Sequence, residues 1–298
     1  SMNLSLYFDK GTLLLFGPKE IIHSNFEDFV WDERTRCHRA PAFKYRHLIT
    51  KMREKKITFR DHARKFSVAD LQLKKKIIPR SFQREAADYW MNEQRGVVTL
   101  PTGSGKTILA VMLIAKTRRP TLIHVPTLEL MRQWKEVLNQ YFYSPVGMLG
   151  GGLNDIQPIT VATYDSALIN VIHKGNQFGL LVFDECHHLP GEQYQFTALA
   201  SIAPFRLGLT ATPRRSDGKE SHLYDLCGKL CYEVHIDELS GHALAPYHVE
   251  TIQIEMNPID REKYINAREK YIKFVRKMSI DFEHPRGWAI FLKKTSQS

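Results

Sequence analysis

The sequence lacks a long apolar run, which argues against a helical membrane protein. No segment approaches the roughly 20 apolar residues that cross a bilayer, and the N-terminus does not show the charged-then-apolar order of a secretory signal. Internal repeats and low-complexity tracts are also absent. We therefore expect a globular protein without a membrane partner, located in the cytoplasm or in the nucleus.

Cysteine is scarce, with four residues in 298 and no CxxC pair. A chain of this size does not need disulfides to hold its core, so we expect reduced thiols. One stretch does gather residue types that bind zinc, namely His222, Cys227, Cys231 and His235. Their spacing fits none of the common finger patterns, so ordinary packing is the prediction and a zinc site is the alternative.

Acidic residues are fewer than basic ones, since 32 Asp and Glu face 42 Lys and Arg, a formal charge of +10. This excess favours contact with phosphate backbones or with anionic membranes, and charge alone does not choose between them. The hydrophobic content of 43% is enough to build folded cores, and the length allows more than one domain.

The first 72 residues predict a small α+β module. Two β-type runs, at 4–8 and 12–16, flank the turn sequence Asp9-Lys10-Gly11, which is a hairpin signature. An amphipathic helical pattern follows from about Lys44 to Lys55. Strands followed by a helix in so short a segment are typical of this class of module.

The segment 73–245 has the pattern of an α/β domain, in which a parallel sheet is flanked by helices. It begins with the basic linker Lys74-Lys75-Lys76 and continues with short apolar runs separated by helix-length amphipathic segments. Crossover helices are expected after Lys106, Leu128 and Tyr164. The expected buried strands are 97–100, 121–125, 159–162, 180–183 and 205–209.

The pattern changes again in the segment 246–298, which we interpret as the start of another unit. A short alternating run at 249–254 precedes a charged helical pattern at 260–278. Its aromatic residues Tyr264, Tyr271 and Phe274 share one helical face, which favours a docked amphipathic helix; a nucleic-acid contact is the alternative.

A glycine-rich loop at 101–107 carries the strongest functional signal, because an apolar strand precedes it and an apolar helix follows it. It ends in the Gly-Lys-Thr of a phosphate-binding loop, although Leu100 replaces the first glycine of that motif. Lys106 is expected to reach the β- and γ-phosphates of ATP, and the Thr107 hydroxyl to hold Mg²⁺. A plain glycine-rich turn is the alternative. The predicted nucleotide-binding residues of the loop are Thr102, Gly103, Ser104, Gly105, Lys106 and Thr107.

A second signal is the acidic pair Asp184-Glu185, which an apolar strand delivers at its carboxyl end. We assign Asp184 to the Mg²⁺ shell and Glu185 to the base that orients the attacking water. Together with Lys106 they form the predicted catalytic set of an ATPase. His187 and His188 follow directly, and a metal-ligand role for them is the alternative.

A third segment, 208–213, closes another expected strand with two hydroxyls. The hydroxyls of Thr210 and Thr212, with Ala211 between them, are predicted to hydrogen-bond the acidic motif and to couple the phosphate state to a nucleic-acid track. His187 of the acidic motif belongs to the same predicted coupling set.

Upstream of the phosphate loop, Arg80 and Gln83 are predicted to contact the nucleotide. The Gln83 amide would face the adenine edge. A surface glutamine at a helix start is the alternative.

Together these motifs resemble the superfamily 2 helicases, and within them the archaeal form of the xeroderma pigmentosum group B (XPB) helicase. The similarity extends over nearly the whole chain. The matching runs are 42–46, the phosphate loop, 125–128 with Gln133-Trp134, 163–167, 184–190 and 203–212.

This resemblance implies a RecA-like domain preceded by a damage-recognition module and followed by part of a helical thumb at Glu262 to Arg276. It also implies 3′ to 5′ ATP-dependent translocation or unwinding of double-stranded or forked DNA in nucleotide excision repair and in transcription. A monomer, a nuclease partner and an archaeal, nucleoid-associated location are expected with it. The implied DNA-binding residues are Arg132, Thr163, Arg215 and Asp217.

The sequence departs from the family in two places. The family's Arg-Glu-Asp element reads Arg215-Ser216-Asp217 here, so its middle acid is missing. No second RecA-like domain follows, and with it an arginine finger is missing, so we expect a truncated chain that binds ATP but hydrolyses it poorly alone. The alternatives are another superfamily 2 translocase of DNA or RNA, and a non-catalytic adaptor whose nucleotide pocket gates binding to DNA or to a nuclease.

Overall fold

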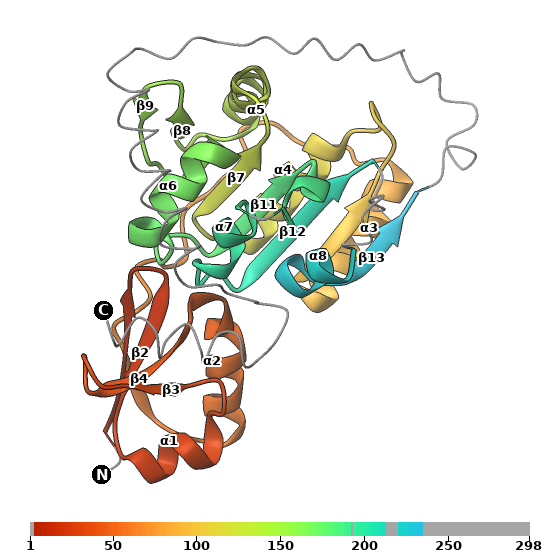
Figure 1. Cartoon of the computed structure of the whole chain (residues 1–298). Helices are drawn as coiled ribbons and strands as arrows, with labels where there is room; N and C mark the ends of the chain where they lie inside the picture. Colours follow the sequence, from red (N-terminus) through yellow and green to blue (C-terminus); the bar gives the residue numbers. More distant parts are fainter. Residues whose placement is uncertain (1–2, 192, 212–219, 235–298) are drawn as a thin grey trace.

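The protein folds into a small α+β module and a larger α/β domain (Figure 1). The structure, a computed structural model, describes residues 3–191, 193–211 and 220–234. The predicted unit at 246–298, including the thumb helix, lies outside the described residues. The same holds for Thr212, Arg215, Asp217 and His235.

The small module contains a five-stranded sheet in the order β3-β4-β2-β1-β5. Its elements are β1 (Leu4–Asp9), β2 (Thr12–Phe16), α1 (Lys19–Asn25), β3 (Val30–Asp32), β4 (Cys37–Pro41), η1 (Ala42–Lys44), α2 (Tyr45–Glu54) and β5 (Phe59–Asp61). The predicted hairpin is confirmed, since β1 and β2 pair antiparallel around Lys10 and Gly11, whose φ angles are 46° and 79°. The predicted helix is confirmed as α2, whereas α1, β3, β4 and β5 were not predicted.

The larger domain contains an eight-stranded sheet in the order β13-β6-β12-β11-β7-β10-β8-β9. Its strands are β6 (Arg95–Thr99), β7 (Thr121–Val125), β8 (Val146–Gly150), β9 (Leu153–Asn154), β10 (Ile159–Thr163), β11 (Leu180–Asp184), β12 (Phe205–Thr210) and β13 (Leu230–Glu233). Among them β6, β7, β10, β11 and β12 confirm the predicted parallel strands. The sequence did not predict β8, β9 or β13.

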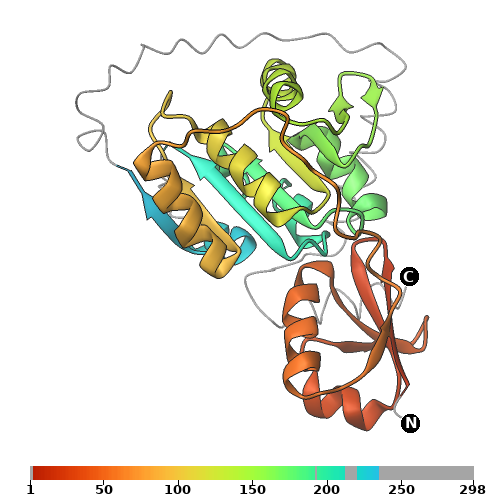
Figure 2. The same cartoon turned by 180° about the vertical axis from the view of Figure 1, so that it is seen from behind.

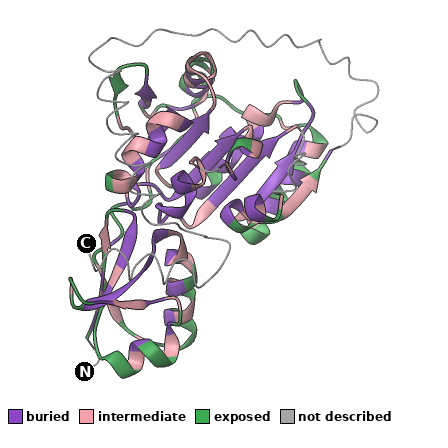
Figure 3. Ribbon diagram, viewed as in Figure 1, coloured by how far each residue is buried: buried purple, intermediate pink, exposed green. Residues whose placement is uncertain are grey.

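Helices cover both faces of this sheet (Figures 1 and 2). They are α3 (Ser81–Glu93), α4 (Lys106–Thr117), α5 (Leu128–Tyr141), α6 (Tyr164–Lys174), η2 (Cys186–His188), α7 (Gln195–Leu199) and α8 (Glu220–Cys227). One core joins α3, α4 and α5 to the sheet, and a second joins α6, α7 and α8 to its other face. Strand β11 shows why both faces of the sheet need a covering layer of helices, because its apolar side chains alternate between the two faces. Val182 enters the first core, while Leu181 and Phe183 enter the second. Figure 3 shows the central strands buried between these layers, whereas the edge strands β9 and β13 are more exposed.

This topology brings two functional loops together. Strand β12 lies between β6 and β11, and all of these strands are parallel, so the loops that follow β6 and β11 leave the same edge of the sheet. Those loops carry the glycine-rich segment and the acidic pair. No helix among the described residues is long and apolar enough to span a bilayer.

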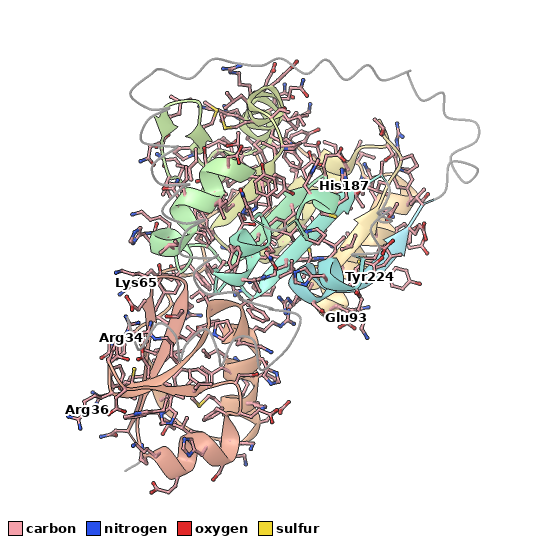
Figure 4. The ribbon with its side chains drawn as sticks, in the orientation of Figure 1. Arg34, Arg36, Lys65, Glu93, His187 and Tyr224 are labelled. Carbon is pink, nitrogen blue, oxygen red and sulfur yellow. The ribbon has the colours of Figure 1, made fainter. Side chains whose placement is uncertain are left out.

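The small module docks on the opposite, amino-terminal edge of this sheet. The Arg46 guanidinium donates hydrogen bonds to the carbonyl oxygens of Glu93 (2.9 Å) and Pro204 (3.1 Å). Asn176 donates to the Ala63 carbonyl at 2.9 Å. The side chain of Ile202, from the larger domain, is buried within the core of the module. Figure 4 shows Glu93 near this interface and His187 at the other end of the sheet.

A linker at 62–80 then runs along the larger domain to the start of α3, across the side that carries α4 (Figure 2). Backbone hydrogen bonds fix it there: Ala69 donates to the Arg118 carbonyl (2.8 Å), and Lys74 to the Tyr141 carbonyl (2.8 Å). Leu73 and Phe142 form an isolated antiparallel bridge. The predicted boundary at residue 72 falls inside this linker.

A buried histidine in β7 makes stability depend on pH. His124 is fully buried, stacks on Phe183 with ring centroids 4.3 Å apart, and donates from Nδ1 to the Val182 carbonyl at 2.9 Å. Its Nε2 has no hydrogen-bond partner among the described residues. Burial lowers the pKa of His124 from 6.5 to about 4. Protonation therefore requires an uncompensated charge inside the core.

We expect the free energy of unfolding to fall as the pH is lowered from 6.5 to about 4. In that window the unfolded chain binds the proton and the folded chain does not, so His124 contributes a loss of about 3 kcal/mol. The substitution His124→Asn keeps a donor for the Val182 carbonyl and should flatten the slope. Urea unfolding of both proteins across this pH range measures it, and equal slopes would contradict the assignment.

Candidate nucleotide-binding site

The glycine-rich loop between β6 and α4 is shaped to hold an anion. Gly103 and Gly105 have φ angles of 78° and 88°, a region that disfavours residues with a side chain. A Cβ at Gly105 would lie only 2.4 Å from Nε2 of Gln83. The loop ends at the start of α4, where the first backbone N–H groups have no partner within the helix and the helix dipole favours negative charge.

Two carboxylates face this loop. Strand β11 ends at Asp184, and Glu185 adopts left-handed backbone angles (φ 49°, ψ 51°) that turn the chain off the strand. Nζ of Lys106 lies 2.8 Å from Oδ1 of Asp184 and 2.8 Å from Oε1 of Glu185. The sequence predicted these residues as neighbours, and the structure brings them into direct contact although 78 and 79 positions separate them from the lysine (184 − 106 and 185 − 106).

The lysine is held as an ammonium ion. Burial by itself would lower the pKa of Lys106, but the charges and hydrogen bonds of Asp184 and Glu185 together raise this pKa above the ordinary lysine value. The same three groups match a magnesium nucleotide, because a phosphate can replace the carboxylates on the ammonium while the carboxylates turn to a divalent cation.

A cavity of about 360 Å³ adjoins these groups. The phosphate loop and the acidic pair line one side, and residues of α5, including Gln133, Trp134 and Val137, line the other. Thr107 lies at the start of α4 within this lining. Its hydroxyl, the Asp184 carboxylate and the loop backbone are the oxygen ligands and N–H donors that Mg²⁺ and a triphosphate need, so the residues present fit ATP with Mg²⁺.

Trp134 is a site residue for which the sequence predicted no role. Its indole Nε1–H donates to Oδ2 of Asp184 at 2.8 Å, and both side chains are buried. The Glu185 backbone N–H donates to the other oxygen, Oδ1, at 2.9 Å. The apolar period of α5, with Met131 and Leu138 on the same buried face, predicts only a packed tryptophan. The structure adds that this tryptophan fixes the orientation of the carboxylate.

We expect Trp134→Phe to weaken Mg²⁺-dependent nucleotide binding about tenfold, because a hydrogen bond to a charged group contributes roughly 1.5–3 kcal/mol. Titration calorimetry with ATP at several Mg²⁺ concentrations measures the change. Trp90→Phe is the matched control, since Trp90 is also buried but donates to the Arg206 carbonyl at 2.9 Å. An unchanged Mg²⁺ dependence in the Trp134 variant would argue against a positioning role.

Gln83 is buried and bonded to the phosphate loop. Its Oε1 accepts from the Arg80 backbone N–H at 2.9 Å, and its Nε2 donates to the Gly105 carbonyl at 3.0 Å. With 4% of its surface exposed, the alternative of a surface glutamine is wrong. Both ends of the amide are engaged with the backbone, so Gln83 supports the loop directly. Its predicted contact with adenine, and that of the exposed Arg80 with the nucleotide, stay predictions.

The predicted contact between β12 and the acidic motif is present. Thr210 at the end of β12 and His187 share a hydrogen bond of 3.3 Å between Oγ1 and Nδ1, and this Nδ1 lies 3.6 Å from Oε2 of Glu185. Ala211 follows directly and is half-buried. A further contact was not predicted: the Tyr164 hydroxyl, at the start of α6, donates to the Asp184 carbonyl at 2.7 Å. The acidic motif therefore touches elements on both of its sides.

Two of the residues that the resemblance assigns to DNA binding lie in the described part of the chain. Arg132 is exposed on α5, two positions before Trp134. Thr163 is 9% exposed, and its hydroxyl caps α6 by accepting from the Ser166 backbone N–H at 3.2 Å. That hydroxyl is already engaged, so a contact with DNA would have to compete with the cap.

Neither alternative metal site gains support. Within residues 3–191, 193–211 and 220–234, no group of three or more His, Cys, Asp or Glu side chains is arranged to hold a metal ion. In the suggested zinc set, His222 is bonded to Gln195 at 2.8 Å. Burial raises the pKa of Cys227 to about 12 and that of Cys231 to about 11, so both are neutral thiols.

Comparison with known proteins agrees with this geometry. Residues 6–63 match the family described as "Xeroderma pigmentosum group B helicase damage recognition domain". Residues 76–215 match "Type III restriction enzyme, res subunit". The UvsW helicase of bacteriophage T4 has a similar fold, with a TM-score of 0.50 and 17% identity over 78% of this chain and 100% of that chain.

Two curated relatives share more sequence. The "DNA 3'-5' translocase XPB2" of Sulfurisphaera tokodaii is 37% identical over 254 residues, which are 85% of this chain and 58% of that protein. The "DNA 3'-5' helicase XPB" of Mycobacterium tuberculosis is 32% identical over 208 residues, 64% of this chain and 37% of that protein. The chain thus spans less than two thirds of the length of these relatives.

The phosphate loop faces an acidic pair at one edge of a parallel sheet, and the segment that contains both matches this restriction-subunit family. These features are those of a nucleotide-binding domain of the superfamily 2 helicases. The N-terminal module, which matches the damage recognition family, indicates a particular type within this superfamily. In this module and in the motor domain the chain is similar to proteins of the XPB type, as the sequence resemblance predicted.

Proposed function

We propose that this chain is the ATP-binding part of a 3′ to 5′ DNA translocase or helicase. The observation that supports the proposal most directly is Lys106 held between Asp184 and Glu185, each at 2.8 Å, beside a loop shaped for phosphate. The relatives matched over most of this chain are named as DNA 3'-5' translocases and helicases, but the chain spans 58% of the first of them. The activity of the whole protein is therefore part of the proposal.

Each residue of the site has a role in ATP hydrolysis. Lys106 binds the β- and γ-phosphates, with backbone N–H groups from 102–107 around them. Asp184, oriented by Trp134, and the Thr107 hydroxyl hold the cation. Bound Mg²⁺ neutralises the phosphate oxygens on which negative charge develops. Glu185 accepts a hydrogen bond from the attacking water and orients it toward the γ-phosphate.

Contacts around the acidic motif would couple this chemistry to DNA. His187 joins Glu185 to Thr210, while Trp134 joins Asp184 to α5, whose exposed Arg132 is a proposed DNA contact. A change at the γ-phosphate can thus reach two surface elements through hydrogen-bonded side chains. Ala211 and Thr212 are also proposed to take part in this coupling. Thr163, Arg215 and Asp217 are proposed as further DNA contacts.

The test is ATP hydrolysis by the protein carrying both motor domains, measured with double-stranded, forked and single-stranded DNA and with RNA. Stimulation by duplex or forked DNA supports the proposal, and stimulation by RNA alone contradicts it. Lesion-bearing DNA in the same assay tests the proposed role in excision repair, and pull-down of a nuclease tests the proposed partner.

A further inference from the structure

A second binding groove lies on the larger domain, away from the nucleotide site. It has a volume of about 480 Å³ and runs between the linker and the later part of α4. The two cavities share no lining residue, although α4 contributes Lys106 and Thr107 to one and Met112, Ala115 and Lys116 to the other. The groove therefore belongs to neither the phosphate loop nor the acidic pair.

Four lysines surround this groove: Lys74, Lys75, Lys76 and Lys116. All of them are exposed, and none takes part in any of the ion pairs found among the described residues. Neither α4 nor the linker segment 71–80 contains an acidic residue. The groove thus has four neighbouring positive charges without local compensation, which favours an anionic occupant.

The lysines are held in place by the fold. The Lys74 backbone N–H donates to the Tyr141 carbonyl at 2.8 Å, and Nζ of Lys75 lies 5.2 Å from the centre of the Tyr141 ring. The Leu73–Phe142 bridge fixes the residue before them. A basic segment pinned to the domain loses less conformational entropy on binding than a free lysine tail does.

The floor of the groove is apolar, which distinguishes between anionic occupants. Leu73, Ile77 and Met112 form it. Two of the most exposed large apolar residues among the described ones adjoin this region in sequence: Ile78, at 87%, lies between the lining residues Ile77 and Pro79, and Tyr143, at 71%, follows Phe142, which pairs with Leu73. Phosphate backbones are bound by cationic and polar groups and gain nothing from an aliphatic floor. A protein segment that carries both acidic and large apolar side chains matches the rim and the floor together.

We propose that this groove, formed by residues 73–79 of the linker and the later part of α4, docks an acidic, apolar-rich peptide segment of a partner protein. The docked segment leaves the nucleotide cavity open, because the groove and that cavity share no lining residue. A partner bound there contacts the same helix whose first residues hold the phosphates.

Fluorescence anisotropy with the present chain tests this proposal. The probe is a labelled synthetic peptide in which Asp and Glu alternate with Leu and Phe, and a labelled DNA duplex is the second probe. Replacing Lys74, Lys75 and Lys76 together by Glu should weaken peptide binding about tenfold, a change of about 1.4 kcal/mol. The matched control replaces Lys10, Lys56 and Lys229 by Glu, which are exposed positions elsewhere with the same change in charge.

The apolar part of the groove is tested by Ile77→Ser, since Ile77 lines the groove and is half-buried, and urea unfolding checks that the variant stays folded. The substitution should weaken peptide binding about fivefold, by loss of apolar burial, and leave duplex binding unchanged. Equal losses in the Lys74–Lys76 variant and in its matched control would overturn the proposal in favour of net charge. Loss of duplex binding with peptide binding intact would overturn it in favour of a nucleic-acid surface, and so would failure of the wild-type chain to bind the peptide.

Discussion

Lys106→Ala is expected to weaken binding of Mg·ATP at least about a hundredfold, since Lys106 is the one cationic side chain among the described residues that line the cavity. In the free protein the same change leaves Asp184, which is 1% exposed, beside Glu185 without the ammonium that both contact at 2.8 Å. We therefore also expect the free energy of unfolding to fall by about 2 kcal/mol.

Titration calorimetry with ATP and Mg²⁺ measures the first effect, and urea unfolding without nucleotide measures the second. Lys116→Ala is the control, because Lys116 lies at the other end of the same helix, exposed and outside the nucleotide cavity. If the Lys106 variant binds Mg·ATP as tightly as the wild type, the cavity does not take the triphosphate in the way proposed. A drop in stability alone would show only a structural ion pair.

Glu185→Gln should separate binding from chemistry. Glutamine keeps the size of the side chain and leaves Asp184 to pair with Lys106, so ATP binding by the present chain should change no more than about threefold. Hydrolysis by the protein with both motor domains should fall about a thousandfold, the usual contribution of a positioned general base. Steady-state hydrolysis with and without duplex DNA measures this loss.

Glu129→Gln serves as the control for that experiment, as Glu129 is a half-buried acid in the first turn of α5 outside the cavity lining. Full DNA-stimulated turnover in the Glu185 variant would favour the adaptor hypothesis, in which the nucleotide pocket only gates binding to DNA or to a nuclease. A loss of nucleotide affinity as large as the loss of turnover would mean that Glu185 acts on binding and not as the base.

The sequence predicted those parts of the fold and site whose signals are local. The loop at 101–107 and the pair Asp184-Glu185 each combine an apolar strand with residues of unmistakable chemistry, and both are where the pattern placed them. Their contact through Lys106 followed from the rule that parallel strands present their carboxyl ends at one edge. The single thumb helix predicted beyond 246 lies outside the described residues.

What the sequence did not reveal depends on contacts between distant residues. Trp134 looks like any buried aromatic until α5 is packed beside β11, 50 positions later. Gln83 looks exposed at a helix start, and only the approach of Gly105 makes it a support of the loop. Strand β8 contains two glycines and reads as a loop, but pairing with β10 makes it part of the sheet.

The burial of Arg206 is a further feature that the local sequence does not predict. A charged residue within an apolar run predicts an exposed position or a strand edge, yet Arg206 is fully buried at the start of β12. Its guanidinium donates to the carbonyls of Ser201 and Leu226 at 2.9 Å and, through Nε, to the carbonyl of Ala203 at 3.1 Å. Backbone carbonyls from the segment 201–203 and from the end of α8 accept the hydrogen bonds of the guanidinium. The local sequence around Arg206 does not predict these acceptors.

The docking of the N-terminal module has a practical consequence for dissecting the protein. Because Ile202 completes the module's core and Arg46 is anchored on Glu93 and Pro204, the piece excised as residues 1–72 would leave an apolar hole and an unpaired guanidinium at the cut face. A protein in which the module is isolated or fused to another motor domain must therefore also include the loop at 200–204.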